Sequence, residues 1–73
     1  MAKYQGHRSW NAWNVSLWIA NDERLYRFAL DCIASNKTRH GAVNRFLQMC
    51  GPKTPDGARY NYTCVMEAFR GLE

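Results

Sequence analysis

Leu25-Tyr-Arg-Phe-Ala-Leu-Asp-Cys-Ile33 is the stretch of this 73-residue chain that decides its fold class. Its apolar side chains recur at i, i+3, i+4, i+7 and i+8, namely Leu25, Phe28, Ala29, Cys32 and Ile33. This spacing puts them on one face of an α-helix and predicts an amphipathic helix over 22–35. Arg24, Arg27 and Asp31 fall on the other face, where Arg27 and Asp31 are predicted to form an i, i+4 ion pair.

Two segments further along the chain repeat this spacing and are predicted to be helical. The segment 39–50 has its apolar residues at Val43, Phe46, Leu47 and Cys50. The segment 59–70 has them at Tyr62, Val65, Met66 and Phe69. Gly51 is placed to follow the earlier helix in a left-handed conformation, and Gly71 to end the later one. Two Pro and two Gly make 51–57 a loop.

The segment 10–20 is predicted to be a fourth helix, because Trp10, Trp13, Leu17 and Ala20 share one helical face. A strand is the competing interpretation, since apolar residues alternate with others over 15–19. Helix is favoured because Trp18 breaks that alternation and no partner strand is visible elsewhere.

Polar residues mark where the predicted helices begin. Ser9 and Thr38 are the expected N-caps of 10–20 and 39–50. Asn21 either ends the first helix or caps the second. Asp22 and Glu23 are expected in the first turn of the second helix, where the positive end of the helix dipole favours acids.

These segments predict an all-α fold, a compact bundle of three to four short helices in a single domain over 1–73. Residues 1–8 are expected to be a loose polar arm, without the apolar core of a signal peptide. No apolar run approaches the roughly 20 residues that span a bilayer, so we expect a cytoplasmic protein without a membrane span.

The composition favours a binding protein. Aromatic residues make up 14% of the chain, more than a small core easily hides, so we expect some of them on a contact surface. The net charge is +4, and seven of the ten basic residues are Arg. This balance suits an acidic partner, either nucleic acid or an acidic protein face, although ordinary solubility charge has the same appearance.

Catalytic and metal-binding motifs are not apparent in the sequence. Cys32, Cys50 and Cys64 are far apart and show no zinc-ligand spacing with His7 or His40, so no metal or cofactor is expected. Each Cys falls in an apolar helical stripe, which is typical of a reduced thiol in a reducing compartment. We therefore predict that the protein is not an enzyme.

Two binding hypotheses remain open at this stage. The turn over 36–38 has the length found in a helix-turn-helix, so the segment 39–50 could read DNA. Its candidate base and phosphate contacts are Lys37, Thr38, Arg39, His40, Asn44, Arg45 and Gln48. The alternative is protein binding through aromatic residues, because one helical face cannot bury Trp10, Trp13 and Trp18 together.

The segment Ser9-Trp-Asn-Ala-Trp-Asn-Val-Ser-Leu-Trp-Ile-Ala-Asn-Asp-Glu-Arg-Leu-Tyr26 resembles a pattern in small uncharacterised proteins of phages and mobile elements. That pattern reads Trp-Asn-Val, then Leu-Trp, then Asn-Asp-Glu, then Leu-Tyr, and it covers about the first half of the chain. The resemblance implies a phage-borne interaction protein, and an anti-CRISPR protein is the leading possibility within that class. It transfers no functional residue.

The expected function is therefore that of a small phage-encoded inhibitor, which docks on a host protein complex such as a CRISPR effector and blocks target DNA binding or a later step. A helix-turn-helix DNA-binding regulator is the alternative, and a homodimer would also account for exposed aromatics. The predicted partner-binding residues, for protein or nucleic acid, are Trp18, Arg24, Arg27, Arg39, Arg45, Arg59, Tyr60 and Tyr62.

Overall fold

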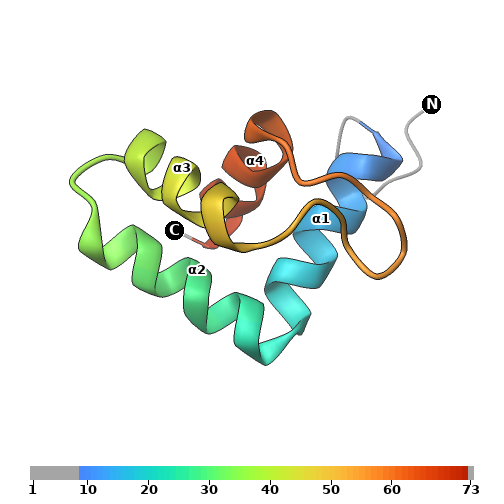
Figure 1. Ribbon diagram of the computed structural model, residues 1–73, viewed down its shortest axis with the longest axis horizontal. Helices are drawn as coiled ribbons and strands as arrows, with labels where there is room; N and C mark the ends of the chain where they lie inside the picture. The colour runs from blue at the N-terminus through green and yellow to red at the C-terminus, as the bar shows by residue number, and fades with distance from the viewer. Residues whose placement is uncertain (1–8, 73) are drawn as a thin grey trace.

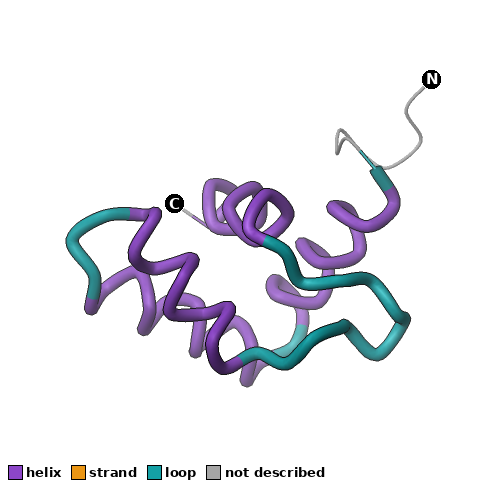
Figure 2. The backbone as a smooth tube through the Cα atoms, turned by 45° about the horizontal axis from the view of Figure 1, so that its top comes forward, coloured by secondary structure: helices purple, strands orange, loops and turns teal. Residues whose placement is uncertain are grey.

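The computed structural model describes residues 9–72, which form four α-helices joined by three connections (Figure 1). The helices are α1 (Trp10–Asn21), α2 (Glu23–Ser35), α3 (Arg39–Met49) and α4 (Tyr62–Leu72). The predicted small all-α bundle is confirmed, and the alternative strand over 15–19 is wrong because those residues lie inside α1 (Figure 2). The arm predicted over 1–8 lies outside the described residues.

Three of the helices begin at a capping side chain. Ser9, Asp22 and Thr38 each accept a hydrogen bond from the backbone N–H three residues on, at 3.1, 3.1 and 3.0 Å. A cap of this kind contributes about 1 kcal/mol to stability. The predicted caps Ser9 and Thr38 are confirmed. Asp22, expected inside the first turn, is itself the cap of α2, and this places Asn21 at the end of α1.

The last helix begins later than the sequence predicts. The predicted range was 59–70, but 52–60 folds as a short hairpin and the helix begins at Tyr62. Asn61 caps it, because its side-chain oxygen accepts a hydrogen bond of 2.9 Å from the N–H of Cys64. Gly71, expected to end the helix, lies within its last turn. The end of α3 agrees with prediction, since Gly51 follows the cap Cys50 with a φ of +87°.

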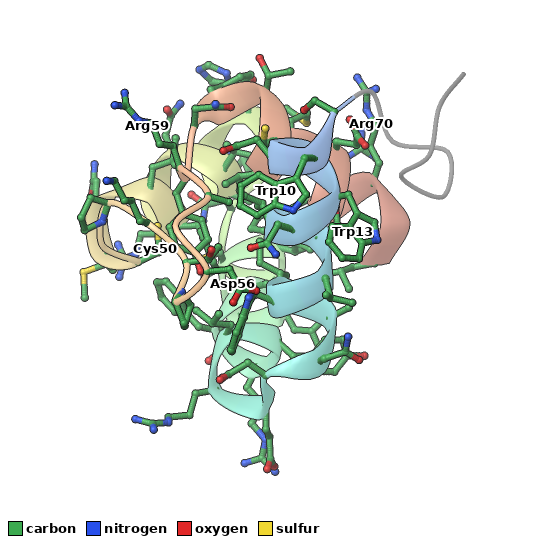
Figure 3. All side chains as sticks on the ribbon, turned by 90° about the vertical axis from the view of Figure 1, so that its right-hand side faces the viewer. Trp10, Trp13, Cys50, Asp56, Arg59 and Arg70 are labelled. Atoms are coloured by element: carbon green, nitrogen blue, oxygen red, sulfur yellow. The ribbon has the colours of Figure 1, made fainter. Side chains whose placement is uncertain are left out.

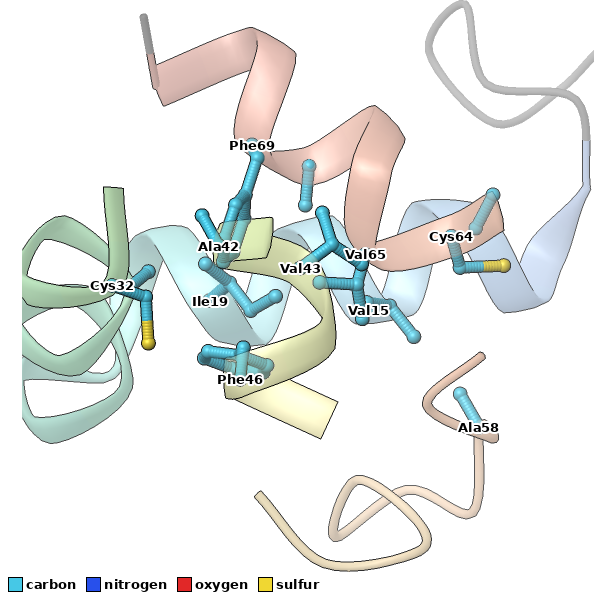
Figure 4. Packing of buried hydrophobic residues seen from close by; sticks show 13 residues of the cluster. Val15, Ile19, Cys32, Ala42, Val43, Phe46, Ala58, Cys64, Val65 and Phe69 are labelled. Carbon is cyan, nitrogen blue, oxygen red and sulfur yellow. The ribbon is translucent and has the colours of Figure 1, made fainter. Parts of the chain in front are cut away.

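Aromatic packing centres on Phe46 of α3. Its ring stacks on Phe28 at a centroid distance of 5.2 Å, and it meets Phe69 and Tyr60 edge-on at 5.4 and 6.0 Å. Val15 and other small apolar residues of α1 complete the core (Figure 4). Such pairs contribute about 0.5–1.5 kcal/mol each beyond their buried area, so Phe46 ties α2, α4 and the hairpin to α3.

Cys32, Cys50 and Cys64 form no disulfide in the structure. Cys32 and Cys64 are buried, where they pack as small apolar side chains. Burial raises the pKa of Cys32, and Arg45 opposes that shift. Cys50 is half-buried at the end of α3.

The buried face of α1 is not the face that carries the tryptophans. Its buried residues are Ala12, Asn14, Val15 and Ile19. Trp10 and Leu17 are 41% and 38% exposed, so the face that includes them, Trp13 and Ala20 lies mostly outside the core. Helix axes pack about 8–10 Å apart, and small side chains at the contact allow that approach while indoles would not. The bulky side chains of α1 consequently lie at the periphery of its contacts with the neighbouring helices.

Candidate functional site

One side of α1 holds the connection between α3 and α4. Asn11, Asn14 and Trp18, at i, i+3 and i+7, all bond to this connection, and we call them the α1 clasp. Asn11 donates a hydrogen bond of 2.8 Å to the carbonyl of Arg59 and accepts one of 2.8 Å from its N–H. The Asn11 side chain thus satisfies both backbone groups of Arg59 and fixes this part of the hairpin against α1.

The rest of the α1 clasp converges on Asp56. Asn14 donates to the Asp56 carboxylate at 3.0 Å and accepts from the Thr54 hydroxyl at 2.7 Å. The indole N–H of Trp18 donates to the same Asp56 oxygen at 2.9 Å. The bonds from Asn14 and Trp18 lower the pKa of Asp56, because they favour its charged form. The indole N–H of Trp18, a predicted partner-binding residue, is therefore already engaged within the fold.

Another side of α1 is open, and its residues Trp10, Trp13 and Leu17 form what we call the α1 face. Trp13 borders a groove of about 280 Å³ between α1 and α4. This α1–α4 groove is lined by Ser16, Leu17 and Ala20 from α1 and by Glu67, Ala68 and Leu72 from α4. Figure 3 shows Trp13 on the side of α1 turned towards α4, with Asp56 on the opposite side.

The α1 face has no charge of its own. None of the twelve residues of α1 is Asp, Glu, Lys or Arg. Leu17 lines the α1–α4 groove and also a second hollow of about 300 Å³, together with Trp18 and Asp22. Depletion of charge together with exposed Trp is typical of the core of a protein interface.

Among the helices of 9–72, none combines the length and apolar character needed to cross a bilayer.

The predicted arginines are exposed but do not gather around Trp18. Arg24 and Arg27 lie on the outer side of α2, where Arg27 pairs with Glu23 at 2.6 Å in place of the predicted Asp31. Both side chains of that ion pair are largely solvated, so it contributes only a few tenths of a kcal/mol. Arg39 and Arg45 lie on α3 and Arg59 on the hairpin.

Tyr60 and Tyr62 take separate positions. Tyr60 is half-buried against Phe46, and burial raises its pKa to about 12. The exposed Tyr62 places its hydroxyl 2.7 Å from Nδ1 of His40, whose Nε2 lies 3.0 Å from the amide nitrogen of Asn44. Of these two predicted partner-binding residues, Tyr60 thus takes part in a core contact and Tyr62 in a surface hydrogen-bond network.

Among the residues that the structure describes, the titratable side chains are too dispersed to suggest a metal centre. Within 9–72 no three His, Cys, Asp or Glu side chains come together in a way that could hold a metal ion. Burial raises the pKa of Cys50 to about 11, so its thiol stays protonated near neutral pH and is a poor nucleophile. What the arrangement offers a partner is apolar contact area and hydrogen bonding.

Sequence reasoning missed Asn11, Asn14 and Asp56 as organising residues, and Trp10 and Leu17 as exposed ones. The available signal was the i, i+3, i+7 spacing of two Asn and a Trp on a helix that lacks charge.

Comparisons with known proteins matched the chain to a family model. Neither curated proteins nor solved structures showed a similar sequence or fold. A family model described as "Family of unknown function (DUF7249)" matches residues 1–69. That match covers nearly the whole chain, including α1, the hairpin and most of α4, and the protein therefore belongs to the DUF7249 family.

Proposed function

We propose that this protein is a small non-catalytic inhibitor, which docks through the α1 face on a protein complex in the cytoplasm of a host cell. A CRISPR effector is the proposed target class, as the sequence resemblance to phage proteins suggests. Binding would block access of target DNA or a later conformational step.

The observation that carries the proposal is the uncharged α1 face beside the α1–α4 groove. At about 280 Å³, the groove is close to the lower limit of roughly 300 Å³ for a ligand pocket, and it suits one large side chain. A partner that fills the groove would also need a hydrogen-bonding group, because the hydroxyl oxygen of Ser16 is buried and has no hydrogen-bond partner among residues 9–72. The matching partner is a protein segment that presents one aromatic or aliphatic anchor and a nearby hydrogen-bonding group.

A matched pair of substitutions tests the α1 face. Leu17 in α1 and Leu30 in α2 are each 38% exposed, so Leu17→Glu and Leu30→Glu carry the same chemical change at equal exposure. We expect both variants to fold. Purified CRISPR effectors of several types, immobilised on a sensor surface, should bind the wild type and Leu30→Glu but bind Leu17→Glu at least about 100-fold more weakly.

Cells with an active CRISPR system provide the functional measurement. Expression of the wild type or Leu30→Glu should restore plaque formation by a targeted phage, while Leu17→Glu should not. If no effector binds the wild type, the target class is wrong. If Leu17→Glu inhibits like the wild type, the α1 face is not the docking surface.

The helix-turn-helix alternative has a weaker basis. The connection between α2 and α3 spans only 36–38, as that motif requires. However, the Asn44 amide and the His40 ring hydrogen-bond to each other, and His40 also bonds to Tyr62. These contacts would have to break before Asn44 could read an adenine edge. We therefore place protein binding first.

A further inference from the structure

Lys53 and Arg59 face each other across the hairpin that connects α3 to α4. They form an isolated antiparallel bridge, flanked by hydrogen bonds from Thr54 N–H to the Ala58 carbonyl (2.8 Å) and from Tyr60 N–H to the Pro52 carbonyl (3.1 Å). This pattern makes Lys53 and Arg59 a non-hydrogen-bonded pair, the kind whose Cα atoms lie only about 4.5 Å apart. Their side chains therefore leave the hairpin on the same face.

That face points to solvent. Thr54 and Ala58, which alternate with Lys53 and Arg59 along the hairpin, are buried, while Lys53 and Arg59 are exposed. Within 9–72, no carboxylate forms an ion pair with either cation. The carboxylate of Asp56, the acid nearest in sequence, is instead bonded to Asn14 and Trp18.

Like charges directly opposite on paired strands destabilise the pairing, so the fold bears a cost at this position. The α1 clasp holds the pair in place nonetheless, because Asn11 bonds to both the N–H and the carbonyl of Arg59. Two cations placed side by side, with no carboxylate partner among the residues that the structure describes, form a preorganised site for an anion, which would relieve their repulsion.

The surrounding sequence extends this positive charge. Residues 36–55 contain Lys37, Arg39, Arg45 and Lys53 and no Asp or Glu, so this stretch alone carries a charge of +4, equal to the net charge of the chain. All four side chains are exposed. Figure 3 shows Arg59 on the same side of the molecule as Cys50, which lies within this stretch, and Arg70 on the opposite side.

We propose that Lys53 and Arg59, which we call the cation pair, bind a backbone phosphate of nucleic acid, with α3 supplying weaker phosphate contacts beside it. Duplex DNA carries one charge per about 1.7 Å of its axis, so even widely spaced cations on a protein each lie near a phosphate. An acidic protein surface, in contrast, would need carboxylates at positions that match those of the cations. This site is independent of the α1 face, and it contacts nucleic acid without reading bases.

Fluorescence anisotropy with a labelled DNA duplex of about 20 base pairs, at salt concentrations from about 50 to 200 mM, tests the proposal. The double variant Lys53→Ala/Arg59→Ala removes the cation pair. Arg24→Ala/Arg70→Ala removes the same net charge from α2 and α4 and serves as the matched control. Circular dichroism melting confirms that both variants fold.

We expect the wild type to bind the duplex at about 50 mM salt and the Lys53→Ala/Arg59→Ala variant to bind at least about tenfold more weakly. Loss of two phosphate contacts should also lower the slope of log K against log salt by about 1.8, while the control keeps its slope within about 0.5. Polyglutamate should displace the duplex at least about tenfold less effectively than unlabelled DNA. Absence of binding at low salt, equal losses in the two variants, or equal displacement by polyglutamate would each overturn the proposal.

Discussion

Replacing Asn14 with Ala should destabilise this domain strongly, although Asn14 is a polar residue on a helix. The side chain is 2% exposed and joins α1 to both Asp56 and Thr54. Alanine removes these two hydrogen bonds, which contribute about 1 kcal/mol each, and leaves the buried Thr54 hydroxyl without its acceptor at a further cost of about 1 kcal/mol. The expected loss is about 3 kcal/mol, a large part of the roughly 4–11 kcal/mol available to a domain of this length.

Thermal unfolding followed by circular dichroism measures this loss directly. A loss of about 3 kcal/mol corresponds to a fall in Tm of about 12–24 °C for a domain of this size. Asn21→Ala is the matched control, since Asn21 lies exposed at the end of the same helix and its replacement should change stability by less than about 0.5 kcal/mol. If Asn14→Ala melts within about 4 °C of this control, the structural role of the α1 clasp is refuted.

Three further outcomes follow from the contacts described above. Hydrogen bonds from Asn14 and Trp18 lower the pKa of Asp56 in the folded protein. The stability that these bonds add is complete above the unfolded-state pKa near 4, and it is lost as the pH falls through the lower folded-state pKa. Asp56→Asn should therefore make the decline of Tm below about pH 4 less steep. Phe46→Ala should lose about 3–5 kcal/mol, seen as a much lower urea midpoint, whereas a loss below about 1 kcal/mol would contradict its central place in the core. Burial raises the pKa of Cys50 to about 11, so iodoacetamide at pH 7.5 should modify it about 100-fold more slowly than the urea-unfolded protein, measured by mass spectrometry.

The parts of the fold that were predictable from the sequence are those fixed by neighbours along the chain. The stripe of Leu25–Ile33 sets the buried face of α2 because its members lie within two helical turns of one another. Ser9 and Thr38 cap their helices through bonds that reach only three residues. Such features depend on local geometry, and local geometry can be read from spacing.

The errors lie where distant segments meet. Asn11 bonds to Arg59 across 48 positions and Asn14 to Asp56 across 42. The i, i+3, i+7 spacing within α1 places Asn11, Asn14 and Trp18 on one side of the helix, but it does not show which distant residues they contact. The same distant pairing holds 59–61 outside α4, which is why that helix begins late. On α1, apolar residues occur on several sides, so spacing alone could not tell which side the core would occupy.

The position of α1 determines how the molecule can come apart. This helix touches α2, α4 and the hairpin at once, and it supplies Val15 and Ile19 to the shared core. Detaching it would remove packing partners from α2, α4 and the hairpin in a domain that is already small for folding alone. Neither half of the chain would keep enough packing to stay folded, so we expect backbone amides in α1 and α4 to be protected by the same global opening rather than by separate local ones.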